Sequence, residues 1–544
     1  MLNKAALYYR TVRRMKPGMA VSRLLGQHKL AESTFDGEHF GNVPRIAIFE
    51  LDLDPLYLAR FDTNKMCHGE FFLINEWHQV DRNTWSVPEA SHLWNFNLHY
   101  FEWGVALAAQ WRTTHKKRYF DCFKTFVSSW IQSCRYSDGD AWHPYTISLR
   151  LINWLIAIEL FDGEVEEDSE FFDSMRESMY SQYRHLFVNQ EMHLRANHWW
   201  ENLKTLIIMS AMFGEHDVHS CVMRHFESQI DEQILPDGVH YERSMMYHKL
   251  VLEGMLRVYL ASKQLNFDLP DNYLQKMKAM LDAIASIEKG MGKTPFFNDS
   301  ADGVAKTGSS LVLACRAVAK IKEDDTITSF QYAGFYKLYE GNIAVVFFAG
   351  EPGPSFMLGH SHCDLLSYEV SVNEKPILVN AGTYAYQSKL RPYFRSTEAH
   401  NTAMTLNGEQ MECWSEHRVA RGVKNINVSE KKKNSLVAKY KTYQGVLHER
   451  NISLKNNALF VSDRFGCSGK TIVSFIHLAP SVCALVNSSN TELSDSNHQV
   501  EVLTDSAISV NQGIYSPEFG IIDKTVKVMR LRTDGNQISY SVKL

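Results

Sequence analysis

Residues 366–379 read LSYEVSVNEKPILV, and this stretch decides the fold class of the second half of the chain. Apolar side chains alternate with polar ones from Leu366 to Val372, and apolar positions two residues apart return at Ile377 and Val379. A period of two places every second side chain on the same face of a β-strand. The polar residues 373–376 between the two runs indicate a turn. The stretch therefore predicts two neighbouring strands of an antiparallel sheet.

The same period returns at the end of the chain. Val526 and Val528 alternate with polar residues, and Asp534-Gly535 is a hairpin signal. Alternation then resumes over residues 538–544. Strand patterns thus extend from about residue 330 to the last residue, which predicts a sheet domain of substantial size.

The apolar period is helical before about residue 310. Apolar residues recur at steps of three and four from Met277 to Ile287, and Gly290 stands where a helix C-terminus is expected. Residues 250–260 and 203–213 predict two further helices, the second closed by Gly214. A run of helices followed by a run of strands predicts two separate domains.

We predict a helical domain over residues 86–320 and a sheet domain over residues 321–544, with the boundary inside 300–332. Residues 1–85 form an extension of mixed character. Its first 30 residues predict a basic helix, and residues 46–51 predict a short strand.

The composition excludes several classes of protein. The 57 Lys and Arg and the 62 Asp and Glu give a net charge of −5, whereas a nucleic-acid-binding domain is basic. The nine cysteines are scattered with no C-x-x-C pair, which excludes a disulfide framework and a cysteine-rich zinc site. Aromatic residues make up 12%, a proportion that fits glycan binding and a large core equally well.

The sequence also predicts a compartment. It has no apolar run long enough for a transmembrane segment and no secretory signal at its start. We therefore expect a cytoplasmic protein. The basic N-terminal helix is expected to be solvated, and contact with a membrane surface or a partner is the alternative. The sequence leaves the oligomeric state open.

Four clusters rich in His, Tyr, Asn and Arg carry the candidate chemistry. The first is RANHWWEN at residues 195–202. On a helix, Asn197 and Glu201 share one face and His198 and Asn202 share another, so polar groups align one turn apart. The alternative is a helix N-terminus with Asn197 as the cap and His198 on the surface.

The second cluster is DGVHYERSMMYH at residues 237–248. Its Asp237-Gly238 pair predicts a turn, and the following residues are expected to enter a helix. Tyr247 beside His248 would supply a proton-transfer group next to a cation. The alternative is a tyrosine packed at a helix interface.

The third cluster is HSHCD at residues 360–364, and the fourth is RSTEAHNT at residues 395–402. An H-x-H pair on a strand places both imidazoles on one face. His360 and His362 would then be two metal ligands, or one ligand and one catalytic group. The fourth cluster adds His400 downstream.

These clusters, in this order, resemble the heparinase II/III-like family, which includes heparin and heparan sulfate lyases and some alginate lyases. Further motifs of the resemblance are NLHYF at residues 97–101, WHPYT at 142–146, FND at 297–299 and GTY at 382–384. The resemblance covers about residues 90–420. It implies an incomplete (α/α) toroid followed by an antiparallel β-sandwich domain, with the active site in the cleft between them.

The resemblance also implies a polysaccharide lyase that cleaves a uronic-acid-containing glycan by β-elimination, with a possible place in surface polysaccharide metabolism or biosynthesis. Asn197 and His198 would neutralise the sugar carboxylate, which stabilises the enolate-like intermediate. Tyr247 and His360 would transfer protons. Glu201 would orient His198 or contact substrate. Other candidates for lining the cleft, each with core packing or a structural ion pair as the alternative, are Tyr100, Tyr145, Arg243 and Arg395.

A structural divalent metal, with zinc as the first candidate, is the cofactor that the resemblance implies. The matching positions are His362, Asn380 and His400. The family usually has Asp at the middle position, and the neutral Asn380 binds a divalent cation more weakly. If no metal binds, the two histidines would be hydrogen-bonded structural residues.

Two other functions compete with the lyase. A glycoside hydrolase on the same scaffold would use paired carboxylates, for which Asp237, Glu242 and Asp299 are available. A non-catalytic glycan-binding or assembly protein would keep the fold without the chemistry. A non-catalytic protein would have little physical reason to keep all four residues of the proposed chemistry. Their presence therefore counts against the binder: Asn197, His198, Tyr247 and His360.

Overall fold

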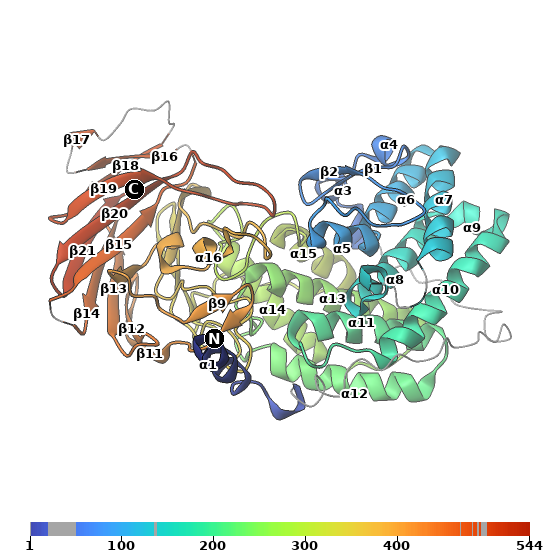
Figure 1. Ribbon diagram of the computed structural model, residues 1–544, viewed down its shortest axis with the longest axis horizontal. Helices are drawn as coiled ribbons and strands as arrows, with labels where there is room; N and C mark the ends of the chain where they lie inside the picture. Colours follow the sequence, from blue (N-terminus) through green and yellow to red (C-terminus); the bar gives the residue numbers. More distant parts are fainter. Residues whose placement is uncertain are drawn as a thin grey trace.

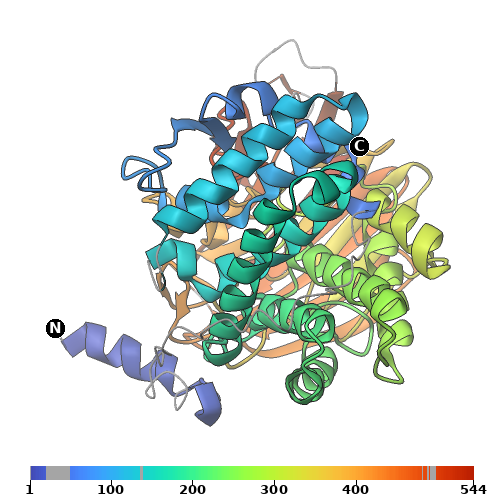
Figure 2. The same ribbon diagram turned by 90° about the vertical axis from the view of Figure 1, so that its right-hand side faces the viewer.

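The computed structural model describes residues 2–19, 50–134, 136, 139–467, 469–480, 482–486, 489–490 and 498–544. Its helices precede its principal sheets along the chain, and the two kinds of structure occupy opposite halves of the molecule (Figure 1). The order of a helical part followed by a sheet part is the one predicted from the change of apolar period. Viewed from the helical side, the helices stand in front of the sheets (Figure 2).

The extension at the start of the chain contains short elements. Helix α1 spans Leu2–Val12, in agreement with the predicted basic helix, and residues 20–30 of that prediction lie outside the described part. The predicted strand over 46–51 is wrong where it can be examined, because Glu50–Leu53 form the 3₁₀ helix η2. The remaining elements are α3 (Pro55–Leu58), α4 (Thr63–Met66), β1 (Glu70–Leu73) and β2 (Glu76–Gln79).

The helical half begins at His92, and its last turns end at Ala319. Neighbouring helices pack through large apolar residues, among them Trp103, Trp154 and Trp200, which are fully buried. The elements are α5 (His92–Tyr100), α6 (Glu102–Thr114), α7 (Lys117–Ser133), η3 (Gly139–Trp142), α8 (Pro144–Leu160), α9 (Asp162–Glu167), α10 (Ser169–Val188), α11 (Ala196–Met212), α12 (His216–Gln233), α13 (Met245–Leu265), α14 (Tyr273–Glu288), α15 (Gly308–Ala314) and η4 (Cys315–Ala319).

Two predicted helix ends are confirmed by their backbone. Helix α14 ends at Glu288, and Gly290 then adopts a φ of +72°. Helix α11 ends at Met212, and Gly214 adopts a φ of +67°. Glycine has no Cβ and tolerates this left-handed conformation, so it lets the chain leave the helix sharply.

The predicted hairpin at residues 366–379 is present in a five-stranded sheet of order β3-β4-β5-β6-β7. Strands β6 (Tyr368–Val372) and β7 (Lys375–Leu378) pair antiparallel, with Val372 opposite Lys375 and Val370 opposite Leu378. Leu366 does not start the strand, because its φ is +58°. The other strands of this sheet are β3 (Ser329–Phe330), β4 (Phe335–Glu340) and β5 (Ile343–Phe348).

Two further sheets carry the end of the chain, with orders β11-β12-β13-β14-β21-β18-β16-β17 and β19-β20-β15-β8. Their pairs are antiparallel except for β16 and β18, which run parallel. The strands are β8 (Ala403–Thr405), β11 (Lys424–Lys432), β12 (Ser435–Lys441), β13 (Leu447–Lys455), β14 (Ala458–Phe465), β15 (Thr471–His477), β16 (Val482–Val486), β17 (Ser489–Asn490), β18 (His498–Leu503), β19 (Ala507–Gln512), β20 (Lys527–Asp534) and β21 (Gln537–Lys543).

One hydrophobic core runs from the helical half into the sheets. Phe297, from the segment between α14 and α15, packs with Phe335 of β4 and Phe348 of β5 at centroid distances of 5.4 and 5.8 Å. Burial of such apolar surface is the dominant stabilising contribution to a fold, so the two halves are held together by the same force that holds each one. Among the described helices, none is apolar over enough length to cross a bilayer.

Candidate active site

His198 is held by a buried carboxylate seven residues earlier in the chain. Its Nδ1 lies 2.9 Å from Glu191 Oε1. Asn202 fixes Glu191 in turn, because its Oδ1 accepts the Glu191 backbone N–H at 2.7 Å and its Nδ2 donates to Oε2 at 3.2 Å. Burial alone would lower the pKa of His198, but the charge of Glu191 and its hydrogen bond raise it above the usual value. This pairing favours the cationic form of the imidazole.

Asn197 lies at the start of α11, as the helical prediction required. The helix begins at Ala196, and the capping residue is Arg195, not Asn197. Asn197 Nδ2 donates to the Tyr145 hydroxyl at 3.3 Å, and its buried Oδ1 has no partner among the described residues. Tyr145 packs against His198 at 4.5 Å between ring centroids and against Tyr100 at 5.9 Å. The amide, the imidazole and two phenols thus form one group.

Tyr247 meets the sheet half of the molecule. It lies in the first turn of α13, whose cap is Ser244, so the helix begins later than the predicted turn at 237–238 suggested. Its hydroxyl lies 2.6 Å from the hydroxyl of Tyr386, and its ring lies 4.4 Å from that of His360. Burial, followed by the neighbouring Tyr386, raises the pKa of Tyr247 well above its usual value. Its phenol is therefore protonated at neutral pH.

The buried Asp299 organises the loop that carries His360 and His362. Its Oδ2 lies 2.9 Å from His360 Nδ1, and its Oδ1 lies 2.8 Å from His362 Nε2. The guanidinium of Arg391 binds both oxygens, and the Nη2–Oδ2 distance is 2.7 Å. Burial alone would raise the pKa of Asp299, but Arg391 and then His362 hold it well below the usual range.

The predicted placement of the H-x-H pair on a strand is wrong. His360 and His362 lie in the irregular segment before β6. Their side chains share a partner because the loop folds over Asp299, not because a strand alternates its faces. In a loop, tertiary contacts replace the periodicity on which the prediction rested.

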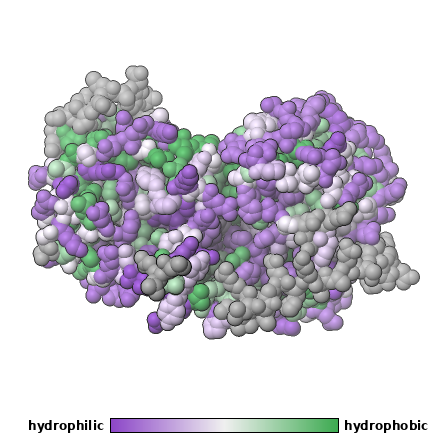
Figure 3. Space-filling model, viewed as in Figure 1, coloured by the Kyte–Doolittle hydropathy of each residue, from purple (hydrophilic) through white to green (hydrophobic). Residues whose placement is uncertain are grey.

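Glu242 connects the helical and sheet-borne parts of the site. It is buried, and its carboxylate accepts a hydrogen bond from the Asn197 backbone N–H. Its Oε1 lies 3.8 Å from His360 Nε2, and the charge of His198 also acts on it. Burial raises the pKa of Glu242. The four predicted catalytic residues, Asn197, His198, Tyr247 and His360, are thus brought together around one carboxyl group. The surface is hollowed between the two halves, with many hydrophilic side chains around the hollow (Figure 3).

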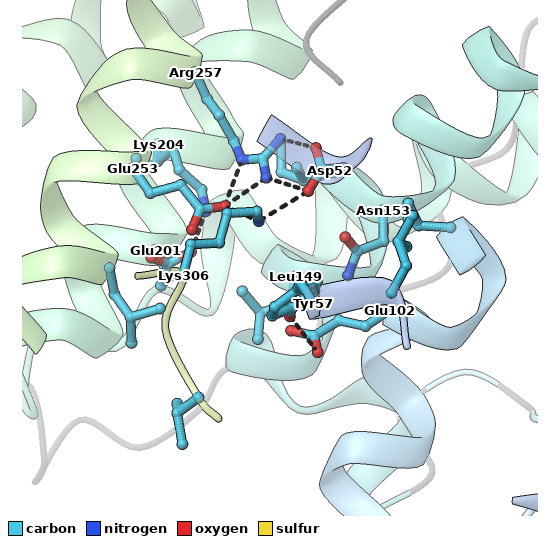
Figure 4. Close-up of a pocket in the computed structure, with 16 residues that line it drawn as sticks. Asp52, Tyr57, Glu102, Leu149, Asn153, Glu201, Lys204, Glu253, Arg257 and Lys306 are labelled. Atoms are coloured by element: carbon cyan, nitrogen blue, oxygen red, sulfur yellow. Dashed lines mark hydrogen bonds and ion pairs between the residues drawn. The ribbon is translucent and has the colours of Figure 1, made fainter. Parts of the chain in front are cut away.

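Glu201 has a different setting from the one expected. It is buried and forms an ion pair with Lys204 in a cavity of about 60 Å³. Figure 4 shows this cavity, where Arg257 and Lys306 also pair with Asp52. Although Glu201 lies one helical turn beyond Asn197 on α11, its carboxylate lines this neighbouring charged cavity. It acts on His198 only through its charge.

For Arg243 and Arg395 the structure favours the structural alternative, because their guanidinium groups are occupied by backbone carbonyl oxygens. Arg243 donates to the carbonyls of Tyr241 and Ala333 at 2.7 and 3.2 Å. Arg395 donates to those of Ser361 and Ser415 at 3.0 and 2.7 Å. A buried cation satisfied in this way holds loops in place and has little left for a substrate. We therefore assign both a structural role.

The two histidines predicted as metal ligands face each other. His362 Nδ1 lies 3.3 Å from His400 Nε2. The other nitrogen of each ring lies against an acceptor. His362 Nε2 faces Asp299 Oδ1, and His400 Nδ1 lies 2.8 Å from the Ser396 carbonyl oxygen. These two nitrogens therefore carry the ring protons. Two lone pairs are thereby left pointing at the same place. Nitrogens about 2.0–2.1 Å from a tetrahedral zinc ion lie about 3.3 Å apart, so the imidazoles fit this ion.

Asn380 fits the metal site less well. Its Oδ1 accepts the Asn401 backbone N–H at 3.0 Å, and its Nδ2 donates to the Phe296 carbonyl at 3.0 Å. Its amide thus connects three segments of backbone. Asn380 can therefore offer a cation only the second lone pair of its Oδ1.

The carboxylates named for a hydrolase do not form a catalytic pair. Asp237 accepts the backbone N–H groups of Tyr332 and Ala333 at 2.7 and 2.9 Å. Asp299 is saturated by Arg391 and the two imidazoles. Glu242 alone remains, whereas hydrolysis of a glycoside normally needs two carboxyl groups.

Comparison with protein families gives a match for each half of the chain. The model described as heparinase II/III N-terminus matches residues 54–319, and the model described as heparinase II/III-like, C-terminal matches residues 323–542. The chain belongs to the heparinase II/III-like family. The resemblance inferred from the motifs is thereby confirmed.

Similar proteins of this family are distant in sequence. A heparin-sulfate lyase from Pedobacter heparinus is 22% identical over 366 residues, which are 61% of this chain and 54% of that protein. The chain thus spans about half the length of this curated relative. The crystal structure of a heparinase III aligns over 96% of this chain and 88% of its own, with 14% identity and a TM-score of 0.69. A heparan sulfate lyase mutant from P. heparinus covers 99% and 88%, with 18% identity and a TM-score of 0.58.

Sequence reasoning missed several residues of this heparinase II/III-like site. Tyr386 follows the GTY motif by two residues, a signal that could have been noticed. Glu191, and His417 whose ring lies 5.5 Å from that of His360, stand in segments with no distinctive pattern. Asp299 was considered as part of the FND motif and as a hydrolase carboxylate, but not as the residue that orients two histidines.

Proposed function

We propose that this chain is a polysaccharide lyase that cleaves a uronate-containing glycan by β-elimination. One observation carries the proposal. Tyr247 of the helical half lies against His360 and Tyr386 of the sheet half, and Glu242 connects this group to Asn197 and His198. Elimination needs a charge-neutralising group, a base and an acid within reach of one sugar, and this arrangement supplies all three.

His198 and Asn197 would bind the uronate carboxylate. Glu191 favours the cationic form of the imidazole, and the second nitrogen of the ring remains for a substrate oxygen. An N–H of the Asn197 amide adds a neutral donor beside it. Placing a fixed cation and donor at the carboxylate stabilises the negative charge that develops when the C5 proton leaves.

His360 is the base that the geometry favours. Asp299 is ionised and accepts the Nδ1 proton, which leaves a lone pair on Nε2. A carboxylate that fixes the tautomer in this way orients an imidazole for proton abstraction. Tyr247, protonated and hydrogen-bonded to Tyr386, would then supply the proton to the leaving glycosidic oxygen.

The finer architecture belongs to the same proposal. We infer that the helices form an incomplete (α/α) toroid and that the later sheets form a β-sandwich. Serial packing of helices supports the toroid, because α6 contacts α8, α8 contacts α11, and α11 contacts α13. Two sheets whose buried residues belong to one hydrophobic core support the sandwich.

We also propose that a divalent metal, zinc foremost, is bound by His362 and His400, with Asn380 as a weak third ligand or a water in its place. The lone pairs that face each other at 3.3 Å support this site. When bound, the metal would supply charge that holds the loop of His360 in place. No step of the elimination is assigned to it.

The test is incubation of the purified protein with a panel of uronate polymers, including heparan sulfate and alginate. A lyase generates a double bond in the terminal uronate, and the ultraviolet absorbance of the product rises. Tyr247→Phe serves as the control for contaminating activity. If the wild type releases reducing ends without this absorbance, the chain is a hydrolase. If it releases neither from any polymer, the lyase proposal fails.

A further inference from the structure

A third imidazole faces the proton-transfer residues. His417 lies between strands β9 (Cys413–Ser415) and β10 (Arg418–Val419), at the tip of a hairpin. Its ring lies 4.9 Å from that of Tyr386 and 5.5 Å from that of His360. Unlike these neighbours, its side chain is exposed. A side chain that adjoins the reacting groups and also faces solvent is available to a substrate.

The inner side of the hairpin is tied to the catalytic loop. Arg391 Nε donates to the Glu416 carbonyl at 3.0 Å, and Arg395 Nη1 donates to the carbonyls of Ser415 and Glu416 at 2.7 and 3.0 Å. These contacts fix the backbone on the N-terminal side of His417. The same Arg391 also binds Asp299, which orients the proposed base His360. One guanidinium therefore holds both the hairpin and the base in place.

The outer side of the hairpin is covered by α1, some 400 residues away in the sequence. Trp414 Nε1 donates to Thr11 Oγ1 at 3.0 Å, and its ring lies 4.7 Å from that of Tyr8. Arg10 pairs with Glu412 at 3.1 Å. The guanidinium of Arg418 lies over the ring of Tyr8 at 4.8 Å. In Figure 1 the helix lies beside β9.

We propose that His417 contacts the glycan beside the reacting sugar and that α1 is the element that positions it. His417 would hydrogen-bond a sugar hydroxyl, and Tyr8 and Trp414 would act as positioning residues through the hairpin. The proposal rests on the function proposed above and adds a substrate contact to it. It also gives the N-terminal helix a role in the site.

The chemistry of His417 suits a hydroxyl. Partial burial of the ring against its neighbours, followed by the electrostatic effect of the nearby His360, lowers the pKa of His417 to about 3. The other charged groups that act on it are Asp299, Arg391 and Arg395. A neutral imidazole has one donor and one acceptor, which match the donor and acceptor of a hydroxyl.

The first experiment measures kcat and KM for His417→Ala and His417→Gln on the uronate polymer that the wild type degrades. We expect a rise of about three- to tenfold in KM for the alanine variant, the usual value of one hydrogen bond. The glutamine variant keeps a donor and an acceptor and should recover part of the loss. Unchanged kinetic constants in His417→Ala would overturn the substrate contact.

The second experiment tests the helix. Tyr8→Ala removes the ring against Trp414, whereas Tyr9→Ala removes the next, more exposed ring of the same helix and is the matched control. We expect Tyr8→Ala to raise KM and Tyr9→Ala to leave it unchanged. In the His417→Ala background, Tyr8→Ala should add nothing, because its effect passes through that imidazole. An equal effect in both backgrounds would show that α1 acts by another route.

These outcomes are distinct from failure of the lyase proposal. If the wild type is inert on uronate polymers, isothermal titration with a non-cleaved uronate oligosaccharide measures the contact without catalysis. Weaker binding by His417→Ala supports the contact, and equal binding overturns it.

Discussion

The carboxylate of Glu191 lies 2.9 Å from Nδ1 of His198, and the two residues belong to different elements. Glu191 precedes α11, whereas His198 lies in its first turn. Between them, Arg195 and Ala196 adopt φ values of +54° and +49°, which turn the chain back on itself. Such conformations are costly for residues other than glycine and persist where the surroundings enforce them. The strained turn is what brings an anion to the imidazole.

Replacing Glu191 by Gln should shift the pH dependence of activity. The amide keeps the shape but loses the charge that raises the pKa of His198, so the imidazole deprotonates at a lower pH. The alkaline limb of the kcat/KM profile should move to lower pH, with a loss of about tenfold at pH 8. Glu170→Gln, on the exposed face of α10, is the control. An unchanged profile would contradict the assigned role of the pair.

The stability of the Glu191→Gln variant should depend on pH in a defined direction. The raised pKa of His198 stabilises the fold fully below its unfolded value of about 6.5, and this contribution is lost as the pH rises through the folded pKa. The deficit of the variant in the free energy of unfolding should therefore be larger at pH 6 than at pH 9. Urea titrations at both pH values measure it, and a deficit that grows with pH would oppose the assignment.

The two phenols should contribute unequally to the rate. Tyr247→Phe removes the proposed proton donor and should lower kcat by about 10²–10⁴-fold. Tyr386→Phe removes only the hydroxyl that lies 2.6 Å from the Tyr247 hydroxyl, and it should lower kcat by about tenfold. Tyr332→Phe, at an exposed site, is the control. Equal losses at the first two positions would indicate that Tyr386 itself transfers the proton.

Asp299→Asn should destabilise the protein strongly. The buried guanidinium of Arg391 would lose its counter-charge, a change that costs about 3–5 kcal/mol in the free energy of unfolding. Because the pKa of Asp299 is depressed, its contribution is present above the unfolded value of about 3.9 and is lost as the pH falls towards the folded one. The difference in the free energy of unfolding between the wild type and the variant should therefore narrow as the pH falls from 5 to 3. Chemical denaturation at these pH values tests the prediction, and a difference in the free energy of unfolding that stays constant with pH would refute it.

The metal proposal predicts about one equivalent of zinc per chain after purification without chelator. His400→Ala should lose it, whereas His216→Ala, on the exposed surface of α12, should retain it. Elemental analysis gives the content, and the melting temperature with and without chelator gives a second readout. The same zinc content in His400→Ala as in the wild type would place the metal elsewhere.

Some of the site was predictable from local sequence because the relevant geometry is local. The helical spacing of Asn197 and Glu201, and the strand pairing of residues 368–378, follow from the periods of a helix and a strand. The prediction for His360 and His362 went wrong because their segment has no regular period. The sequence left a substrate contact and a structural role open for Arg243 and Arg395, because a guanidinium that binds backbone carbonyls looks the same in sequence as one that binds substrate.

The sequence by itself determined the order of helices and strands and the family. Both are carried by apolar periodicity and by motifs that lie within a few residues of one another. The tertiary structure decided that Tyr247 meets Tyr386, that Asp299 holds two histidines, and that α1 covers the hairpin of His417. These contacts join residues from about 60 to 400 positions apart. Contacts between residues so far apart in sequence depend on how whole helices and sheets pack, and a local sequence pattern carries no information about that packing.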